Sequence, residues 1–145
     1  MKSLVPQGYR YLEHITDAYI EAYGSSLSEA FDHSGRALIN LMFDIETVNG
    51  LVPITISVEG TDELELLYNW LERVLLTVLV EGQIMSKFDV RIYSDSMLRL
   101  EASTMTESID MIKHAYKTEV KGITYHAMEV THDEGMIVTR YIVDL

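Results

Sequence analysis

The sequence has no cysteine, only two prolines and few basic residues, and two of these shortages exclude particular kinds of site. Without cysteine there is no disulfide framework and no thiolate metal site, which fits a reducing compartment. Eleven lysines and arginines stand against 23 acidic residues, a formal net charge of −12. Because clustered basic side chains bind phosphate backbones, tight direct nucleic-acid binding is not expected. A basic protein partner or a cation is the easier match, although acidity also serves solubility alone.

Long apolar runs are missing as well. The most apolar stretch covers residues 74–80 and includes Thr77, whereas a membrane-spanning helix needs roughly 20 apolar residues. The first six residues contain no apolar run of the length that a signal peptide needs. The sequence therefore predicts a cytoplasmic protein without a membrane segment.

Common catalytic and nucleotide-binding motifs are absent too. The chain contains no GxxxxGK or GxGxxG loop, no GxSxG turn and no HExxH motif. No small-molecule substrate is therefore expected. The 145 residues are 48% hydrophobic and 9% aromatic, which suits one folded core, and no linker divides them. Residues 1–145 are expected to form a single domain.

Apolar residues at every second position predict strands in both halves of the chain. The expected strands cover residues 9–14, 17–23, 54–58, 88–92, 98–102, 119–130 and 136–145. Residues 132–135 have the composition of a four-residue hairpin loop. Residues 104–117 are expected to form a polar connection.

Two helices are expected between the strands. The first begins at the capping box formed by Ser26 and Glu29, and the second begins at Asp62 and ends before Gly82. Gly35 lies inside the first helix, where glycine costs about 1 kcal/mol relative to alanine, so a close neighbour is expected there. Trp70 is expected to anchor the core. This order of elements favours an α+β fold with helices packed on antiparallel sheet.

Polar residues at the two ends of the pattern are candidates for a functional site. His14 and Asp17 lie at the junction of the first two strands, where a histidine and a carboxylate could transfer protons or hold a metal. Asp144 precedes Leu145, which adds a terminal carboxylate, and such oxygen ligands suit Ca²⁺ or Mg²⁺. A solvated turn and a frayed chain end explain the same residues without a function. The spacing does not show that Asp17 and Asp144 meet.

Several segments, in order along the chain, resemble the archease family. Residues 9–14, Tyr-Arg-Tyr-Leu-Glu-His, followed by Asp17, are similar to the family's E-H-T-A-D signature. Residues 119–126, Glu-Val-Lys-Gly-Ile-Thr-Tyr-His, are similar to its V-K-A-V-T-Y-H strand. Further similar segments cover residues 20–24, 27–31, 62–71 and 142–145. The chain departs from the family pattern at Ile15-Thr16, Ala18-Tyr19, Thr106 and Gly122, and none of these changes removes a carboxylate.

The resemblance implies a function and a site. Archeases activate RtcB-type RNA ligases, which join RNA ends in tRNA splicing. This chain is therefore expected to promote guanylylation of the ligase's active-site histidine and to permit multiple turnover, without being an enzyme itself. The resemblance also implies a divalent-metal site, usually for calcium with magnesium or manganese as alternatives, formed by Asp17, Asp144 and Leu145. An acidic surface suits a partner that binds metal and RNA.

Two other classes of function remain open. A chaperone-like protein would bind exposed apolar surface on many clients without needing a metal. A small hydrolase or isomerase would use His14 and Asp17 as an acid–base pair, although the sequence offers no nucleophile or pocket motif for it.

Overall fold

The computed structural model describes residues 7–12 and 17–145, and residues 1–6 and 13–16 lie outside its described part. The described chain forms strands, two long helices and one short 3-10 turn. In chain order they are β1 (Tyr9–Leu12), β2 (Asp17–Gly24), α1 (Leu27–Met42), η1 (Ile45–Thr47), β3 (Val52–Gly60), α2 (Glu63–Leu79), β4 (Gln83–Ser94), β5 (Leu98–Ser108), β6 (Gly122–Asp133) and β7 (Met136–Asp144).

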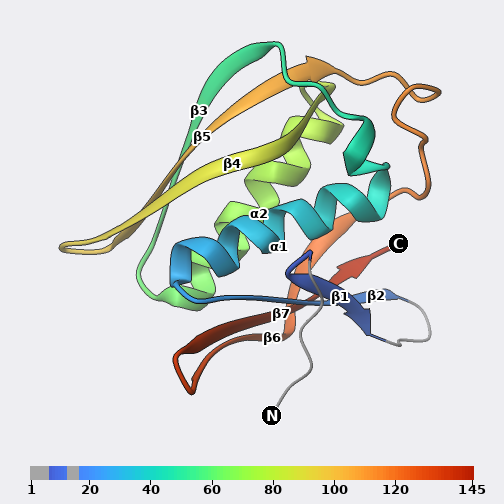
Figure 1. Cartoon of the computed structure of the whole chain (residues 1–145). Helices are drawn as coiled ribbons and strands as arrows, with labels where there is room; N and C mark the ends of the chain where they lie inside the picture. Colours follow the sequence, from blue (N-terminus) through green and yellow to red (C-terminus); the bar gives the residue numbers. More distant parts are fainter. Residues whose placement is uncertain (1–6, 13–16) are drawn as a thin grey trace.

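The strands form two antiparallel sheets with the helices between them (Figure 1). One sheet has the order β1-β2-β7-β6 and the other the order β3-β5-β4. Each helix packs against strands of both sheets, so each sheet has one face on the helices. The predicted α+β fold with helices on antiparallel sheet is confirmed, and the strands divide between two sheets. Neither of the two helices is long and apolar enough to span a membrane.

Both predicted helix starts are confirmed by their caps. The Ser26 hydroxyl accepts a hydrogen bond from the Glu29 main-chain N–H at 3.1 Å, and the Glu29 carboxylate accepts from the Ser25 N–H at 3.0 Å. At α2 the Asp62 carboxylate accepts from the Glu65 N–H at 2.8 Å. These bonds satisfy N–H groups that the helix itself leaves unpaired. Local sequence therefore determines where each helix begins.

Trp70 anchors the core, as predicted. Its side chain is fully buried, and the indole N–H donates to the Phe31 carbonyl at 2.8 Å. A Cβ atom at Gly35 would lie only 3.0 Å from the Trp70 ring and 3.2 Å from the Phe88 ring. The absent side chain at Gly35 therefore lets α1 lie directly against both rings, which explains a glycine within the helix.

Two predicted connections are wrong. The predicted four-residue loop is a two-residue turn, Glu134 and Gly135, between β6 and β7. Both residues have positive φ, 50° and 76°, as a two-residue hairpin turn of the I′ type requires. Residues 104–108 belong to β5. Thr104 and Thr106 are buried in that strand, and their hydroxyls donate to main-chain carbonyls, so polar side chains fit a buried strand face.

Candidate metal centre

The register of β2 and β7 brings two predicted site residues together. Asp17, the first residue of β2, lies directly opposite Asp144, the last residue of β7. Directly opposed residues of an antiparallel pair have Cβ atoms about 4.5–5.5 Å apart and point to the same face. Ile20 and Ala22 of β2 belong to the core beneath the helices, so Asp17 lies on the outer face. Asp17 is half-buried and Asp144 is exposed.

The first residue of β6 leaves space beside this pair. Gly122 also lies opposite Asp144, and the Lys121 N–H donates to the Asp144 carbonyl at 2.7 Å. A Cβ atom at Gly122 would lie 3.9 Å from Asp144 Oδ2, an ordinary van der Waals contact. Glycine therefore leaves this side of the carboxylate uncovered, and an alanine here would fit without a clash.

The donor chemistry of Asp17 and Asp144 fits a hard cation. Two like charges directly opposite each other destabilise a sheet, and a cation between them would relieve that repulsion. Carboxylate and main-chain oxygens are the ligands that Ca²⁺ and Mg²⁺ prefer, and Leu145 follows Asp144 directly. Within residues 7–12 and 17–145, no group of three or more His, Cys, Asp or Glu side chains could hold a metal. A cation here would therefore need further ligands, such as main-chain oxygens or water.

A ladder of ion pairs crosses the outer face of the sheet that carries Asp17 and Asp144. Glu21 lies four residues after Asp17, and its carboxylate contacts Arg10 at 2.6 Å and Arg140 at 2.7 Å. Arg140 also contacts Glu129 at 2.9 Å, so the ladder spans all four strands. Burial by itself raises the pKa of Glu21, but the hydrogen bonds from the two arginines outweigh it and hold the pKa below its usual value. The ladder thus fixes β2 against β7 beside the aspartates.

His14, the partner of Asp17 in the acid–base hypothesis, lies outside the described residues. That hypothesis is therefore neither confirmed nor contradicted by the structure.

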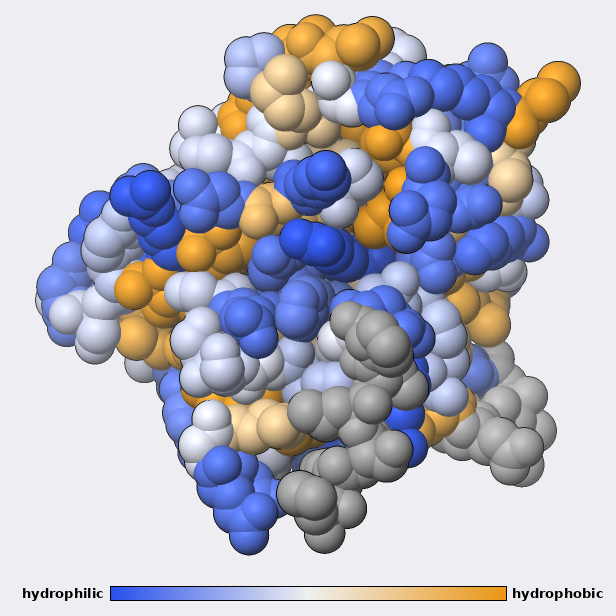
Figure 2. Space-filling model, viewed as in Figure 1, coloured by the Kyte–Doolittle hydropathy of each residue, from blue (hydrophilic) through white to orange (hydrophobic). Residues whose placement is uncertain are grey.

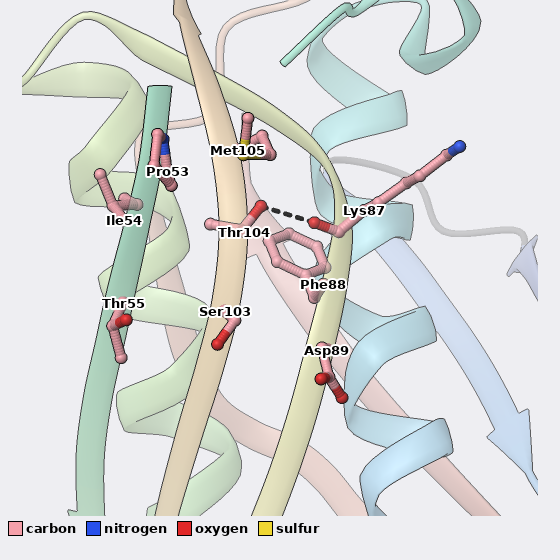
Figure 3. Close-up of a pocket in the computed structure, with 9 residues that line it drawn as sticks. All are labelled: Pro53, Ile54, Thr55, Lys87, Phe88, Asp89, Ser103, Thr104 and Met105. Atoms are coloured by element: carbon pink, nitrogen blue, oxygen red, sulfur yellow. Dashed lines mark hydrogen bonds between the residues drawn. The ribbon is translucent and has the colours of Figure 1, made fainter. Parts of the chain in front are cut away.

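A cavity of about 550 Å³ lies on the sheet β3-β5-β4. It is lined by Pro53, Ile54, Thr55, Lys87, Phe88, Asp89, Ser103, Thr104 and Met105. The Thr104 hydroxyl donates to the Lys87 carbonyl, while the Lys87 amine points away from the other labelled residues (Figure 3). These lining residues include no histidine or cysteine, and Asp89 is their only carboxylate. The cavity does not offer an acid–base pair for catalysis.

Exposed apolar side chains gather at one end of the same sheet. Leu51, Val52 and Met105 are 71%, 55% and 43% exposed, and Val52 and Met105 lie on the paired strands β3 and β5. Hydrophobic residues stand out at the top of the view in Figure 2, over the start of β3 and the end of β5. The chaperone-like alternative would use such a surface.

Sequence reasoning missed a buried polar cluster centred on Glu107. The Glu107 side chain is 6% exposed and accepts hydrogen bonds from Lys113 Nζ at 2.7 Å, the Asn49 N–H and His114 Nε2 at 3.0 Å. The buried His114 ring accepts at Nδ1 from the Asp110 N–H, so Nε2 carries the proton that it donates. The cluster fastens the connection after β5 to the segment after α1. It is structural, because its histidine is fully buried.

This cluster should give the fold a specific sensitivity to acid. Burial alone raises the pKa of Glu107, but its three donors outweigh burial and lower the pKa to about 2 from 4.5. Since the folded pKa lies below the unfolded one, the contribution is complete above about pH 4.5 and is lost as the pH falls toward 2. In urea unfolding between pH 7 and pH 3, Glu107→Gln should therefore lose less stability than the wild type.

The control for this measurement is Glu119→Gln, which changes an exposed glutamate. It should keep the acid dependence of the wild type. If both variants show the same dependence, Glu107 does not carry the acid sensitivity.

Comparison with known proteins gives a consistent result. Residues 9–145 match the model of the archease protein family (MTH1598/TM1083). The protein archease of Sulfurisphaera tokodaii is 33% identical over 139 residues, covering 96% of this chain and 99% of that protein. The protein archease of Pyrococcus abyssi is 37% identical over 123 residues, covering 84% and 87%.

Solved structures agree with the sequence comparison. The solution structure of Methanobacterium thermoautotrophicum protein 1598 has a TM-score of 0.84 and 31% identity, covering 96% of this chain and 99% of that one. A crystal structure of an archease from Thermotoga maritima, described as a possible chaperone, has a TM-score of 0.60 and covers 92% and 94%. At 15% identity, this second likeness shows the fold alone.

Proposed function

The chain belongs to the archease family, and on that premise we propose that it activates an RtcB-type RNA ligase of tRNA splicing. It promotes guanylylation of the ligase's active-site histidine and permits multiple turnover, while catalysis stays with the ligase. The ligase is its partner in the cytoplasm, and RNA is contacted by the ligase.

The observation that carries the proposal is the meeting of Asp17 and Asp144 at one end of a sheet. Together they place two negative charges at a point that is partly open to solvent, on a chain whose formal net charge is −12. The cleft of an enzyme that binds RNA and a nucleotide must present positive charge and metal ions. Complementary charge steers such partners together and fixes how they dock.

The same two carboxylates, with a main-chain oxygen of Leu145, would hold a divalent cation. Calcium is the proposed ion, with magnesium or manganese as alternatives, because all three accept oxygen ligands. When bound, such a cation stabilises the negative charge that develops during nucleotidyl transfer. Asp17 and Asp144 fix its position at the docking end of the sheet, and the Glu21 ladder keeps their strands in register.

A guanylylation assay with purified ligase tests the proposal. Labelled GMP on the ligase and joined RNA are measured with and without substoichiometric amounts of this chain. The chain should raise the rate of guanylylation and the number of RNA molecules joined per ligase. By itself it should neither hydrolyse GTP nor join RNA. If even an excess of the chain leaves guanylylation unchanged, the proposal is wrong.

A pull-down with and without EDTA separates this function from chaperone-like binding. A ligase activator with a metal site should capture the ligase, and EDTA should weaken the capture. A chaperone would capture many unfolded proteins regardless of EDTA.

A further inference from the structure

Strand β6 departs from regular pairing in its middle. Its pairs with β7 are regular up to Thr124 and resume at Glu129, so residues 125–128 lie opposite the single residue Tyr141. Ala127 has a φ of 59°, a left-handed conformation that few residues other than glycine adopt. Because β6 is an edge strand, the extra residues can bulge outward without breaking a second ladder. The first residue of this irregular segment is an exposed tyrosine.

That tyrosine, Tyr125, forms a fixed aromatic face on the surface. Its ring stacks on the ring of Tyr68 from α2, with centroids 4.3 Å apart and planes 6° apart. The stack covers one face of Tyr125, yet the residue remains 51% exposed. With one ring face covered by Tyr68, a partner group would stack on the other face. An aromatic face held rigidly toward water can receive a cation or a planar group.

Carboxylates surround this pair of rings. Burial, followed by the charges of Glu65, Asp62 and Glu72, raises the pKa of Tyr125. The Glu72 carboxylate beside the Tyr68 hydroxyl raises the pKa of Tyr68 as well. Among the ion pairs of the described residues, none involves these three carboxylates. Each ionised carboxylate has more acceptor sites than its contacts within the chain use.

We propose that Tyr125, Tyr68 and these three carboxylates form a docking surface for an arginine side chain of a partner protein. A guanidinium group is planar, so it stacks on an aromatic face while its N–H groups donate to carboxylates. A lysine ammonium is compact and strongly hydrated, and it satisfies the carboxylates without stacking. RNA is a poor occupant, because its phosphates would meet the carboxylates.

The position of this surface suggests which partner carries the arginine. Tyr125 follows Gly122 by three residues along β6, roughly 10 Å of strand, and Gly122 lies opposite Asp144. The aspartates lie on the outer face of the sheet and Tyr125 stacks on α2, so a protein docked at the aspartates would reach the tyrosines by extending around the edge strand β6. The identity of that protein as an RtcB-type ligase rests on the proposed function, whereas the preference for arginine does not.

An NMR titration tests the preference without any ligase. N-acetyl-arginine amide should shift the ring signals of Tyr125 and Tyr68 in a saturable manner, with an affinity several-fold higher than that of N-acetyl-lysine amide. Tyr125→Leu should remove this difference. Tyr93→Leu changes another exposed tyrosine, on the other sheet, and should preserve it. Equal responses to the two ligands, or an unchanged preference in Tyr125→Leu, would overturn the inference.

Binding to the ligase then separates this inference from the proposed function. Tyr125→Leu and Glu72→Gln should each raise the Kd for the ligase about tenfold, and Tyr93→Leu should not. Glu72→Gln keeps an acceptor for the Tyr68 hydroxyl, and melting curves check the fold of every variant. If the ligase binds the wild type and both test variants equally, the docking surface is wrong while the proposed function stands. If the ligase does not bind the wild type, the proposed function fails and the titration alone decides the preference.

Discussion

Calcium should raise the melting temperature of the wild-type chain, and Asp17→Asn or Asp144→Asn should each abolish the shift. A ligand that binds only the folded state stabilises it by mass action, by about 2.7 kcal/mol at a hundred times its Kd. For a chain of this length such a gain raises the melting temperature by roughly 5–10 °C. Asparagine keeps the shape of the side chain and removes its charge, so the loss would report on the carboxylate.

The behaviour without calcium provides a second check on the same variants. Since Asp17 and Asp144 are opposite each other, removal of one charge relieves repulsion. In EDTA, Asp144→Asn should therefore melt at or above the temperature of the wild type. Asp89→Asn, at an exposed position on the other sheet, should keep the full calcium shift. A variant at Asp17 or Asp144 that keeps the full shift would show that its carboxylate is not a ligand.

Leu71→Ala should lower the free energy of unfolding by about 2–5 kcal/mol. Leu71 is fully buried on α2, so its truncation leaves a cavity between the sheets. Leu76→Ala makes the same chemical change on the same helix, but Leu76 is 41% exposed. Its cost should stay below about 1 kcal/mol. Urea unfolding measures both, and equal costs would mean that the buried face of α2 has been misassigned.

The helices were predictable because their determinants are local. The side chains of Ser26 and Asp62 each accept a hydrogen bond from the main-chain N–H three residues later. The apolar residues around Trp70 repeat with the helical period. The division into two sheets was not predictable in this way. It depends on β2 pairing with β7 and β3 with β5, and alternation within a strand does not identify its distant neighbour.

For the candidate site, too, single residues could be predicted from the sequence, whereas contacts between distant residues could not. Asp17 and Asp144 were identified one by one through the family resemblance, but their meeting follows from a register between strands far apart in sequence. The Glu107 cluster was missed because Glu107, near the end of β5, is bonded to residues of connecting segments, which have no periodicity. The bulge in β6 was missed because Ala127 is not a glycine, so residues 119–130 predict an uninterrupted strand.

The central claim is that the carboxylates of Asp17 and Asp144 are what the ligase requires from this chain. The most direct test is ligase guanylylation with the double variant Asp17→Asn/Asp144→Asn, added in the same substoichiometric amount as the wild type. Urea unfolding first establishes that the variant is folded. The account predicts guanylylation and turnover no higher than those of the ligase alone. Stimulation equal to that of the wild type would contradict the account, although the chain would still belong to the archease family.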